Sequence, residues 1–229
     1  MFPDRAELER LYAYPDGDKT WVRTNFVSTL DGAAYDESGK SGSLGGDVDT
    51  RVFALLRSLA DVIIVGAGTA RTEGYEPVRD EDVDAELRSR LGLAAVPPIA
   101  VVSRRLDIPQ PLRGGGQLLI TTTDAPMLDA LSEDMDVLAF GDGVIDWPAA
   151  FAELANRGLT RVLCEGGPTL HGALLGQDLV DDLCLTIAPV LAAGAAPRIA
   201  HGPEAVTHEM ERAHVVDADG VLLTRWVRS

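Results

Sequence analysis

Two glycine-containing segments carry the strongest chemical signal in this sequence. They are Val65-Gly-Ala-Gly-Thr-Ala-Arg71 and Glu165-Gly-Gly-Pro-Thr-Leu170, and each follows a short apolar run. Glycine lets backbone N–H groups approach a phosphate closely, and the start of a helix adds unpaired donors and partial positive charge. Both segments therefore predict phosphate-binding turns, with the Thr69 hydroxyl as a further donor. A plain tight turn is the alternative interpretation of the second segment.

The first segment differs from the dinucleotide fingerprint G-x-G-x-x-G. Arg71 stands in the place of the third glycine, and no second strand ending in an acidic residue follows about 20 residues later. We therefore predict a phosphate turn between a strand and a helix at this point, and not a Rossmann domain.

A third candidate region is the run Thr24-Asn-Phe-Val-Ser-Thr-Leu-Asp-Gly32. Asn25, Ser28 and Asp31 are polar residues within or beside an apolar stretch. A buried polar group without a partner costs about 1–3 kcal/mol, so these side chains need structural hydrogen bonds or a ligand. Because Asp31-Gly32 is also typical of a turn, a turn and a site both remain open here.

The charge balance narrows the classes of partner. The formal net charge is −16 at pH 7, whereas nucleic acids and anionic membranes are bound through basic faces. We expect neither as a partner. Any phosphate site must then be local, which makes the adjacent Arg104 and Arg105 informative.

Length and composition predict one domain. The 229 residues are 46% hydrophobic and 24% charged, which is enough apolar material for one large core. We expect a single domain over residues 1–229, with residues 1–20 as a polar N-terminal lead-in that wraps the surface. No run approaches the roughly 18 apolar residues of a membrane span, and the charged start is unlike a signal peptide. The expected location is cytoplasmic.

Common metal and nucleophile motifs do not occur in the sequence. The four histidines are not arranged in pairs at metal-ligand spacing, and Cys164 and Cys184 each lie in an apolar run. We therefore predict no metal site and no disulfide. Neither G-x-S-x-G nor the P-loop pattern is present, so the usual sequence grounds for an esterase or an NTPase are missing.

Apolar runs and helical spacings alternate along the chain and predict an α/β fold with a mainly parallel sheet flanked by helices. The predicted strands are residues 21–28, 61–65, 99–102, 118–122, 137–140, 161–164, 183–188, 213–217 and 221–227. The predicted helices are residues 47–60, 82–91 and 147–156, and one that begins near Pro168. Asp219-Gly220 is a two-residue hairpin signal, so the sheet should end in an antiparallel C-terminal hairpin.

Four segments, taken together and in order, resemble one known family. They are Arg23-Thr-Asn-Phe-Val-Ser-Thr-Leu-Asp-Gly32, Leu56-Arg-Ser-Leu-Ala-Asp-Val-Ile-Ile-Val-Gly-Ala-Gly-Thr-Ala-Arg71, Val162-Leu-Cys-Glu-Gly-Gly-Pro-Thr-Leu-His171 and Leu179-Val-Asp-Asp-Leu183. The family is the C-terminal reductase domain of the bifunctional riboflavin biosynthesis deaminase-reductase, and the similarity covers about residues 21–226. It implies a dihydrofolate-reductase-like fold, NADPH as hydride donor and a homodimer. The zinc deaminase motifs H-x-E and P-C-x-x-C of the partner domain do not occur.

The resemblance also implies a role for individual residues. Asp31 and Glu165 would be catalytic and face the nicotinamide and the substrate, and Asn25 and Ser28 would lie on the substrate side. The residues implied to bind the coenzyme are Gly66, Gly68, Thr69, Gly166, Gly167, Thr169 and Leu170 at the pyrophosphate, Thr121 and Thr123 beside the adenosine, and Ser103, Arg104 and Arg105 at the 2′-phosphate. Arg57, Arg71 and Arg79 are candidates for a substrate phosphate, because a guanidinium grips phosphate with two hydrogen bonds; an ordinary surface role is the alternative for each.

Two departures from the family bear on the substrate. The position of Asn25 is usually lysine, and the stretch matching Thr72-Glu-Gly-Tyr-Glu-Pro77 usually carries two acids followed by proline. The first hypothesis is NADPH-dependent reduction of 5-amino-6-(5-phosphoribosylamino)uracil at C1′ to the ribitylamino product. The alternatives are a reductase of dihydrofolate or another pterin-like heterocycle, and a protein that binds NADPH without turnover.

Overall fold

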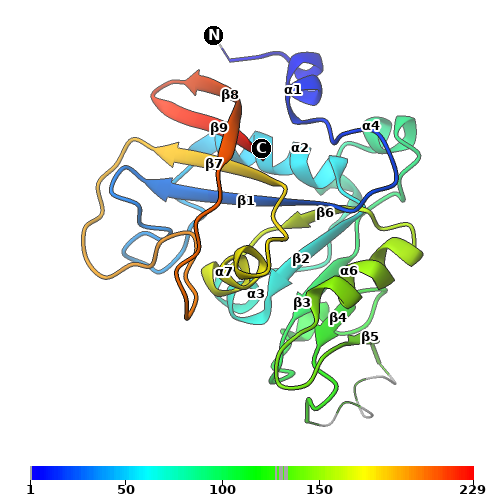
Figure 1. The fold of residues 1–229 in the computed structure, drawn as a ribbon. Coiled ribbons are helices and arrows are strands. Elements are labelled where there is room, and N and C mark those ends of the chain that lie inside the picture. The colour runs from blue at the N-terminus through cyan, green and yellow to red at the C-terminus, as the bar shows by residue number, and fades with distance from the viewer. Residues whose placement is uncertain (1, 127, 129–130, 132–133) are drawn as a thin grey trace.

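The computed structural model describes residues 2–126, 128, 131 and 134–229. In this part of the chain, one sheet of nine strands has the order β5-β4-β3-β2-β6-β1-β7-β9-β8 (Figure 1). The strands are β1 Trp21–Thr29, β2 Val62–Gly66, β3 Ile99–Val102, β4 Leu118–Thr121, β5 Asp136–Ala139, β6 Arg161–Cys164, β7 Asp182–Ala188, β8 Met210–Ala218 and β9 Val221–Arg228. All pairs from β5 to β7 are parallel, whereas β9 pairs antiparallel with both β7 and β8.

The C-terminal hairpin forms as the sequence predicts. Asp219 and Gly220 connect β8 to β9 with φ of 56° and 89°, the positive values that a two-residue turn needs to match the twist of the strands. The mainly parallel sheet with an antiparallel edge confirms the predicted fold class.

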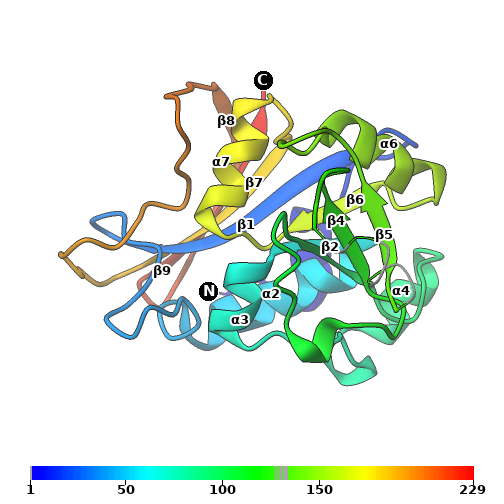
Figure 2. The same cartoon turned by 90° about the horizontal axis from the view of Figure 1, so that it is seen from below.

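Helices cover both faces of the sheet. They are α1 Arg5–Tyr12, α2 Gly46–Leu59, α3 Ala67–Glu73, α4 Ala85–Arg90, α6 Trp147–Asn156 and α7 Pro168–Gly176, with short 3-10 turns at Asp80–Asp82 and Gln110–Leu112. Figure 2 shows α2 and α3 on one side of the sheet and α6 and α7 on the other. None of the described helices has both the length and the apolar character that crossing a bilayer requires.

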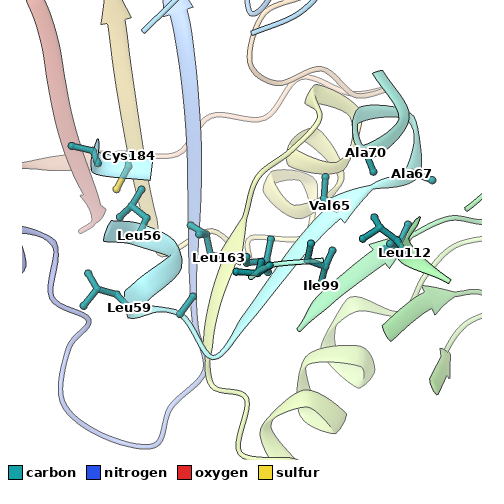
Figure 3. Packing of buried hydrophobic residues seen from close by; sticks show 14 of the residues in the cluster. Leu56, Leu59, Val65, Ala67, Ala70, Ile99, Leu112, Leu163 and Cys184 are labelled. Carbon is teal, nitrogen blue, oxygen red and sulfur yellow. The ribbon is translucent and has the colours of Figure 1, made fainter. Parts of the chain in front are cut away.

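The core lies in two layers, one on each face of the sheet. In β2, Ile63 and Val65 belong to the layer under α2, and Val62 and Ile64 belong to the layer under α6 and α7. Figure 3 shows the first layer, where Leu56 of α2 packs toward strands β6 and β7. Because side chains alternate along a strand and both faces are covered, β2 is apolar throughout, as its sequence predicts.

Two segments differ from the sequence expectations. The lead-in contains helix α1, capped by Asp4, which accepts a hydrogen bond from the Glu7 N–H at 2.9 Å, and it buries Leu8 and Tyr12. The spacing of these two residues by four places them on one face of a single helix. The helix predicted at residues 82–91 starts later, at Ala85, because Asp84 is its N-cap and accepts from the Leu87 N–H.

Candidate active site

Two connected clefts open at the edge of the sheet where the parallel strands β1, β2, β3 and β6 end, which is where α/β sheets bind ligands. The glycine groove has a volume of about 840 Å³ and its lining includes Gly66, Gly68, Thr69, Arg104, Arg105, Gly167, Thr169 and Leu170. The acidic cleft has a volume of about 370 Å³ and its lining includes Asn25, Asp49, Arg57, Glu73, Tyr75, Glu76, Arg79, Asp82 and Glu165. The residues that line both are Tyr35, Thr69, Glu73, Gly167 and Pro168.

The floor of the glycine groove consists of the starts of two helices. Helix α3 follows β2 with Gly66 as its N-cap, and α7 follows β6 with Gly167 as its N-cap. The Gly66 N–H donates to the Gly166 carbonyl at 2.8 Å, which holds the two turns side by side. Because glycine has no side chain to cap a helix, the first N–H groups of α7 are left for another acceptor.

Gly167 packs closely against two side chains. A Cβ at this position would lie 2.3 Å from the Thr69 Oγ1 and 3.4 Å from the Tyr35 hydroxyl. A Cβ on Gly68 would meet nothing within 4 Å, so that residue presents its backbone to open space. The turns therefore have the close backbone approach that a phosphate site needs.

Gly166 lies beneath the groove and does not line it. Its φ is 90°, and a Cβ here would come within 2.9 Å of the Phe26 ring. Phe26 in turn stacks on His171 of α7 with ring centroids 4.6 Å apart. Burial lowers the pKa of His171 to about 4, so this ring is a neutral packing partner at physiological pH. Gly166 is therefore a turn residue that shapes the groove from below.

The far end of the groove contains the predicted basic pair. Ser103, Arg104 and Arg105 follow β3 and line the groove, and Arg104 donates to the Gly143 carbonyl at 3.1 Å. The structure does not bring Thr121 and Thr123 there.

Thr121 is fully buried in β4, and the Thr123 hydroxyl donates to the Gly141 carbonyl at 2.7 Å. Neither residue lines the groove; Val144, Ile145 and Trp147 line it instead. Sequence reasoning assigned these three residues no part in the site, and their only signal is an apolar group at the start of the predicted helix at 147–156.

A buried ion pair lines the acidic cleft. Arg57 donates to both Glu165 oxygens at 2.8 Å each, and the Tyr75 hydroxyl donates to Oε2 at 2.8 Å. The Glu165 side chain is 1% exposed and that of Arg57 is 13% exposed. Burial is the largest single effect on the pKa of Arg57 and lowers it, but the charge and hydrogen bonds of Glu165, together with the contribution of Tyr75, leave the pKa raised. Burial also raises the pKa of Tyr75 well above its ordinary value, so the phenol remains protonated.

This ion pair changes the interpretation of Arg57. Its guanidinium was a candidate for a substrate phosphate, but the two hydrogen bonds that would grip phosphate are made to Glu165. Arg79 also lines the cleft, and it pairs with Glu81 at 2.6 Å and with Asp82 at 3.2 Å. Both arginines that line the cleft in the described part of the chain are therefore bonded to carboxylates.

Asp49 was missed by sequence reasoning. It lies in the first turn of α2, lines the cleft and accepts a hydrogen bond from the Thr186 hydroxyl of β7. Burial raises its pKa and the Thr186 bond lowers it, with burial the larger effect. Its only sequence signal is its place as an acidic residue in the first turn of a helix. Acidic residues are common there because the helix dipole favours negative charge at the N-terminus, so this signal does not indicate a site.

Glu73 and Asn25 complete the parts of the cleft that the sequence singled out. Glu73 accepts from both the N–H and the hydroxyl of Ser41 at 2.9 Å each, which ties the loop after β1 to the end of α3. Asn25 of β1 also lines the cleft.

Asp31 lines neither cleft. Its carboxylate accepts from the Thr29 hydroxyl and from the N–H groups of Ala192 and Ala193 at 3.1 and 2.7 Å. These hydrogen bonds lower its pKa to about 2. Asp31 therefore joins the turn after β1 to the loop after β7, as in the turn interpretation.

Ser28 and Arg71 do not line the acidic cleft. Ser28 is buried in β1, and its side chain points to the same face of the sheet as that of Phe26, the face covered by α7. Ser28 lines neither cleft. Arg71 lines the glycine groove and pairs with Asp107 at 2.8 Å. Among the described residues, no cluster of three or more His, Cys, Asp or Glu side chains is arranged to hold a metal ion.

The sheet order and the paired clefts define an α/β domain with a mainly parallel sheet, an antiparallel C-terminal edge and a ligand site at the ends of the parallel strands. A pyrimidine reductase-like protein from Corynebacterium diphtheriae superposes with a TM-score of 0.81 at 24% identity, covering 97% of this chain and 98% of that one. The riboflavin biosynthesis reductase Rib7 of Saccharomyces cerevisiae gives a TM-score of 0.69 at 14% identity, covering 99% and 100%. At these identities the likeness concerns the fold.

The family follows from the sequence match. The model of the RibD C-terminal domain matches residues 20–223, and the chain belongs to that family. A 2,5-diamino-6-ribosylamino-4(3H)-pyrimidinone 5′-phosphate reductase of Archaeoglobus fulgidus is 28% identical over 182 residues, or 77% of this chain and 83% of the relative. The riboflavin biosynthesis protein RibD of Mycobacterium tuberculosis is 28% identical over 178 residues, which is 76% of this chain and 43% of the relative. The family resemblance expected from the four motifs is confirmed.

Proposed function

We propose that this chain is an NADPH-dependent reductase of a ribosylaminopyrimidine, and that 5-amino-6-(5-phosphoribosylamino)uracil is the first substrate to test. The observation that carries the proposal is the junction of the two clefts at Tyr35, Thr69 and Gly167. A coenzyme in the glycine groove and a heterocycle in the acidic cleft would meet there. When bound, NADPH supplies a hydride for C1′ of the imine form of the substrate, and solvent supplies the proton for the nitrogen.

The groove fits a dinucleotide in three respects. The capless start of α7 and the backbone of Gly68 suit a diphosphate. The volume of about 840 Å³ suits a large ligand. Arg104 and Arg105 at the far end suit an additional phosphate, which supports NADPH over NADH.

The residues of the chain would act by positioning. Glu165, Arg57 and Tyr75 fix one wall of the acidic cleft through hydrogen bonds of 2.8 Å. Asn25 offers an amide donor and acceptor from the strand beside it. A fixed wall holds the substrate against the coenzyme in one orientation, which is the contribution that hydride transfer needs from the protein. Asp31 has no part in this proposal, because it lies outside both clefts.

The test is consumption of NADPH, followed by absorbance, with the phosphoribosylaminouracil as substrate. Turnover that yields the ribitylamino product supports the proposal. Tight NADPH binding without turnover on any pyrimidine or pterin would overturn it and favour the third hypothesis, a coenzyme-binding protein without catalysis.

A second candidate is a reductase of dihydrofolate or another pterin-like heterocycle. It is favoured by Asn25 in place of the family's lysine and by the carboxylates of the acidic cleft, since pterins present N–H donors. Dihydrofolate-dependent NADPH consumption separates it from the first candidate.

The proposed assembly is a homodimer of a single-domain chain over residues 1–229. Light scattering during size-exclusion chromatography tests it, with twice the chain mass of 24.4 kDa as the expected value.

A further inference from the structure

We propose that Tyr35 is a catalytic residue of the proposed reaction, and that its hydroxyl donates the proton that the substrate nitrogen takes up as the hydride reaches C1′. This inference rests on the proposed function, because it takes the junction of the two clefts as the place of reaction. Solvent remains the source of the proton, and Tyr35 is the group through which the proton arrives. Tyr35 lies beyond the first of the four family segments, so the resemblance assigned it no role.

The first argument is the position of the Tyr35 hydroxyl. Tyr35 is one of the few residues that line both clefts. A Cβ at Gly167 would lie 3.4 Å from the Tyr35 hydroxyl and 2.3 Å from the Thr69 Oγ1, which places both hydroxyls beside the start of α7. A hydride donor in the glycine groove and an acceptor in the acidic cleft would meet next to them.

The second argument is the chemistry of the other residues at the junction. Gly167 and Pro168 have no acidic side chain, and the aliphatic hydroxyl of Thr69 is a far weaker acid than a phenol. The Glu73 carboxylate accepts two hydrogen bonds from Ser41 at 2.9 Å each, and an ionised carboxylate has no proton to donate. Tyr35 is therefore the best proton donor among the described residues that line both clefts.

The surroundings of Tyr35 keep its phenol protonated. Burial raises the pKa of Tyr35, the charge of Glu73 raises it further, and a hydrogen bond with Thr69 lowers it by less. The hydroxyl therefore carries a proton at physiological pH, as a general acid requires. A nitrogen that has received the electron pair of a C=N bond is a much stronger base than a phenolate, so the transfer remains favourable with a raised pKa.

The loop that carries Tyr35 is fixed on both sides of this residue. The Ala34 N–H donates to the Pro197 carbonyl, and the Asp36 N–H donates to the Lys40 carbonyl, at 2.9 Å each. The Tyr35 side chain is half-buried, so solvent can return a proton to it. A fixed donor that solvent can recharge meets the geometric requirement for general acid catalysis.

The proposed step balances in atoms and electrons. C1′ gains the hydride, the electron pair of the C=N bond moves to nitrogen, and nitrogen bonds the proton that leaves the Tyr35 oxygen. The carbon is thereby reduced, and NADPH is oxidised to NADP⁺. The tyrosinate then takes a proton from water and is ready for another turnover.

The experiment compares wild type with Tyr35→Phe, which removes only the hydroxyl. With the phosphoribosylaminouracil as substrate, kcat of the full chain should fall by about 10²- to 10⁴-fold, the range expected for the loss of a general acid. KM and the dissociation constant of NADPH should stay within a few-fold of wild type.

A second measurement does not depend on turnover. The dissociation constant of the ribitylamino product is measured by calorimetry on the chain saturated with NADP⁺. Tyr35→Phe should bind the product about 2- to 10-fold more weakly, because it loses one hydrogen bond between the product N–H and the phenol oxygen.

The matched control is Tyr14→Phe, which removes the same atom away from both clefts. The Tyr14 hydroxyl donates to the Val162 carbonyl at 3.3 Å, and Tyr14 lines neither cleft. Its kcat and its affinity for the product should equal those of wild type. A melting temperature of Tyr35→Phe close to that of wild type shows that the loss of rate is not a failure to fold.

The outcomes separate this inference from the proposed function. A kcat of Tyr35→Phe within a few-fold of wild type, or an equal loss in Tyr14→Phe, would overturn the inference and leave the function standing. If wild type consumes no NADPH with any ribosylaminopyrimidine, the proposed function and the proton step both fail. A product affinity unchanged in Tyr35→Phe would also contradict the contact between the hydroxyl and the nitrogen.

Discussion

The glycine groove and the acidic cleft adjoin at one edge of the sheet but are built in different ways. The groove offers backbone N–H groups from two turns, and its critical residues are glycines within two short segments. The cleft offers side chains, and its central pair joins Arg57 to Glu165 across 108 positions of the chain. A site built from backbone can be recognised from a local motif, whereas a site built from side chains depends on the folded arrangement.

This difference predicts that the two regions fail differently when mutated. Side-chain changes in the cleft should affect folding as well as function, because its charges compensate one another. Changes in the groove should affect coenzyme binding more than folding.

The largest effect is expected for Arg57→Ala. It leaves the buried Glu165 without its cation, which should reduce the free energy of unfolding by about 3–5 kcal/mol. Urea denaturation measures the loss. The matched control is Arg71→Ala, whose ion pair with Asp107 is exposed and should contribute at most about 1 kcal/mol. Equal losses in the two variants would contradict the buried ion pair as a source of stability.

Gly167→Val tests whether the glycine groove binds the coenzyme. Its side chain would occupy the space beside the Thr69 hydroxyl, where a Cβ already lies only 2.3 Å away. NADPH affinity, measured by fluorescence, should fall by about 10²-fold or more while the fold is largely retained. Gly68→Ala is the comparison variant and should lose less, since its Cβ meets nothing within 4 Å. Unchanged NADPH affinity in Gly167→Val would mean that Gly166 and Gly167 form a turn and do not bind the coenzyme.

Coenzyme choice should depend on the basic end of the groove. Replacing both Arg104 and Arg105 by alanine should reduce the preference for NADPH over NADH by about 10²-fold, because two charge-assisted contacts to the 2′-phosphate are lost. Dissociation constants for both coenzymes measure the change, and NADH binding should be nearly unaffected. An equal NADPH dissociation constant in wild type and the double variant would place the 2′-phosphate elsewhere.

The smallest effect on turnover is expected for Asp31→Asn. Because Asp31 lies outside both clefts, turnover should stay within a few-fold of wild type. A loss of about 10²-fold would restore a catalytic role.

Its effect on stability should depend on pH. The folded state lowers the pKa of Asp31 from 3.8 to about 2, so its stabilisation is present above about pH 4 and is lost as the pH falls toward 2. The difference in melting temperature between wild type and Asp31→Asn should shrink over that interval. A difference independent of pH would contradict the carboxylate as its source.

The parts of the molecule that the sequence predicts correctly are those with local signals. The two glycine turns, the all-apolar strand β2 and the Asp219-Gly220 hairpin each depend on residues close together in the chain. The spacing of Leu8 and Tyr12 in α1 is also a local signal. It was not recognised as a helix because most of the residues around these two are polar.

The parts that could not be predicted depend on long-range pairing. The carboxylate of Asp49 lines the cleft and accepts a hydrogen bond from Thr186 of β7, 137 positions along the chain. Ser28 is buried within β1, and Asp31 is held by the loop after β7. The chemical type of each residue was visible in the sequence, but its surroundings were not.

The hydrogen bond from the Gly66 N–H to the Gly166 carbonyl has a consequence for stability. It joins turns that are 100 residues apart, so the floor of the groove is incomplete until β2 and β6 have paired. A ligand that binds across both turns binds the native pairing and not the unfolded chain, and such a ligand stabilises the native state by mass action. The melting temperature of the chain should therefore rise with the concentration of the coenzyme.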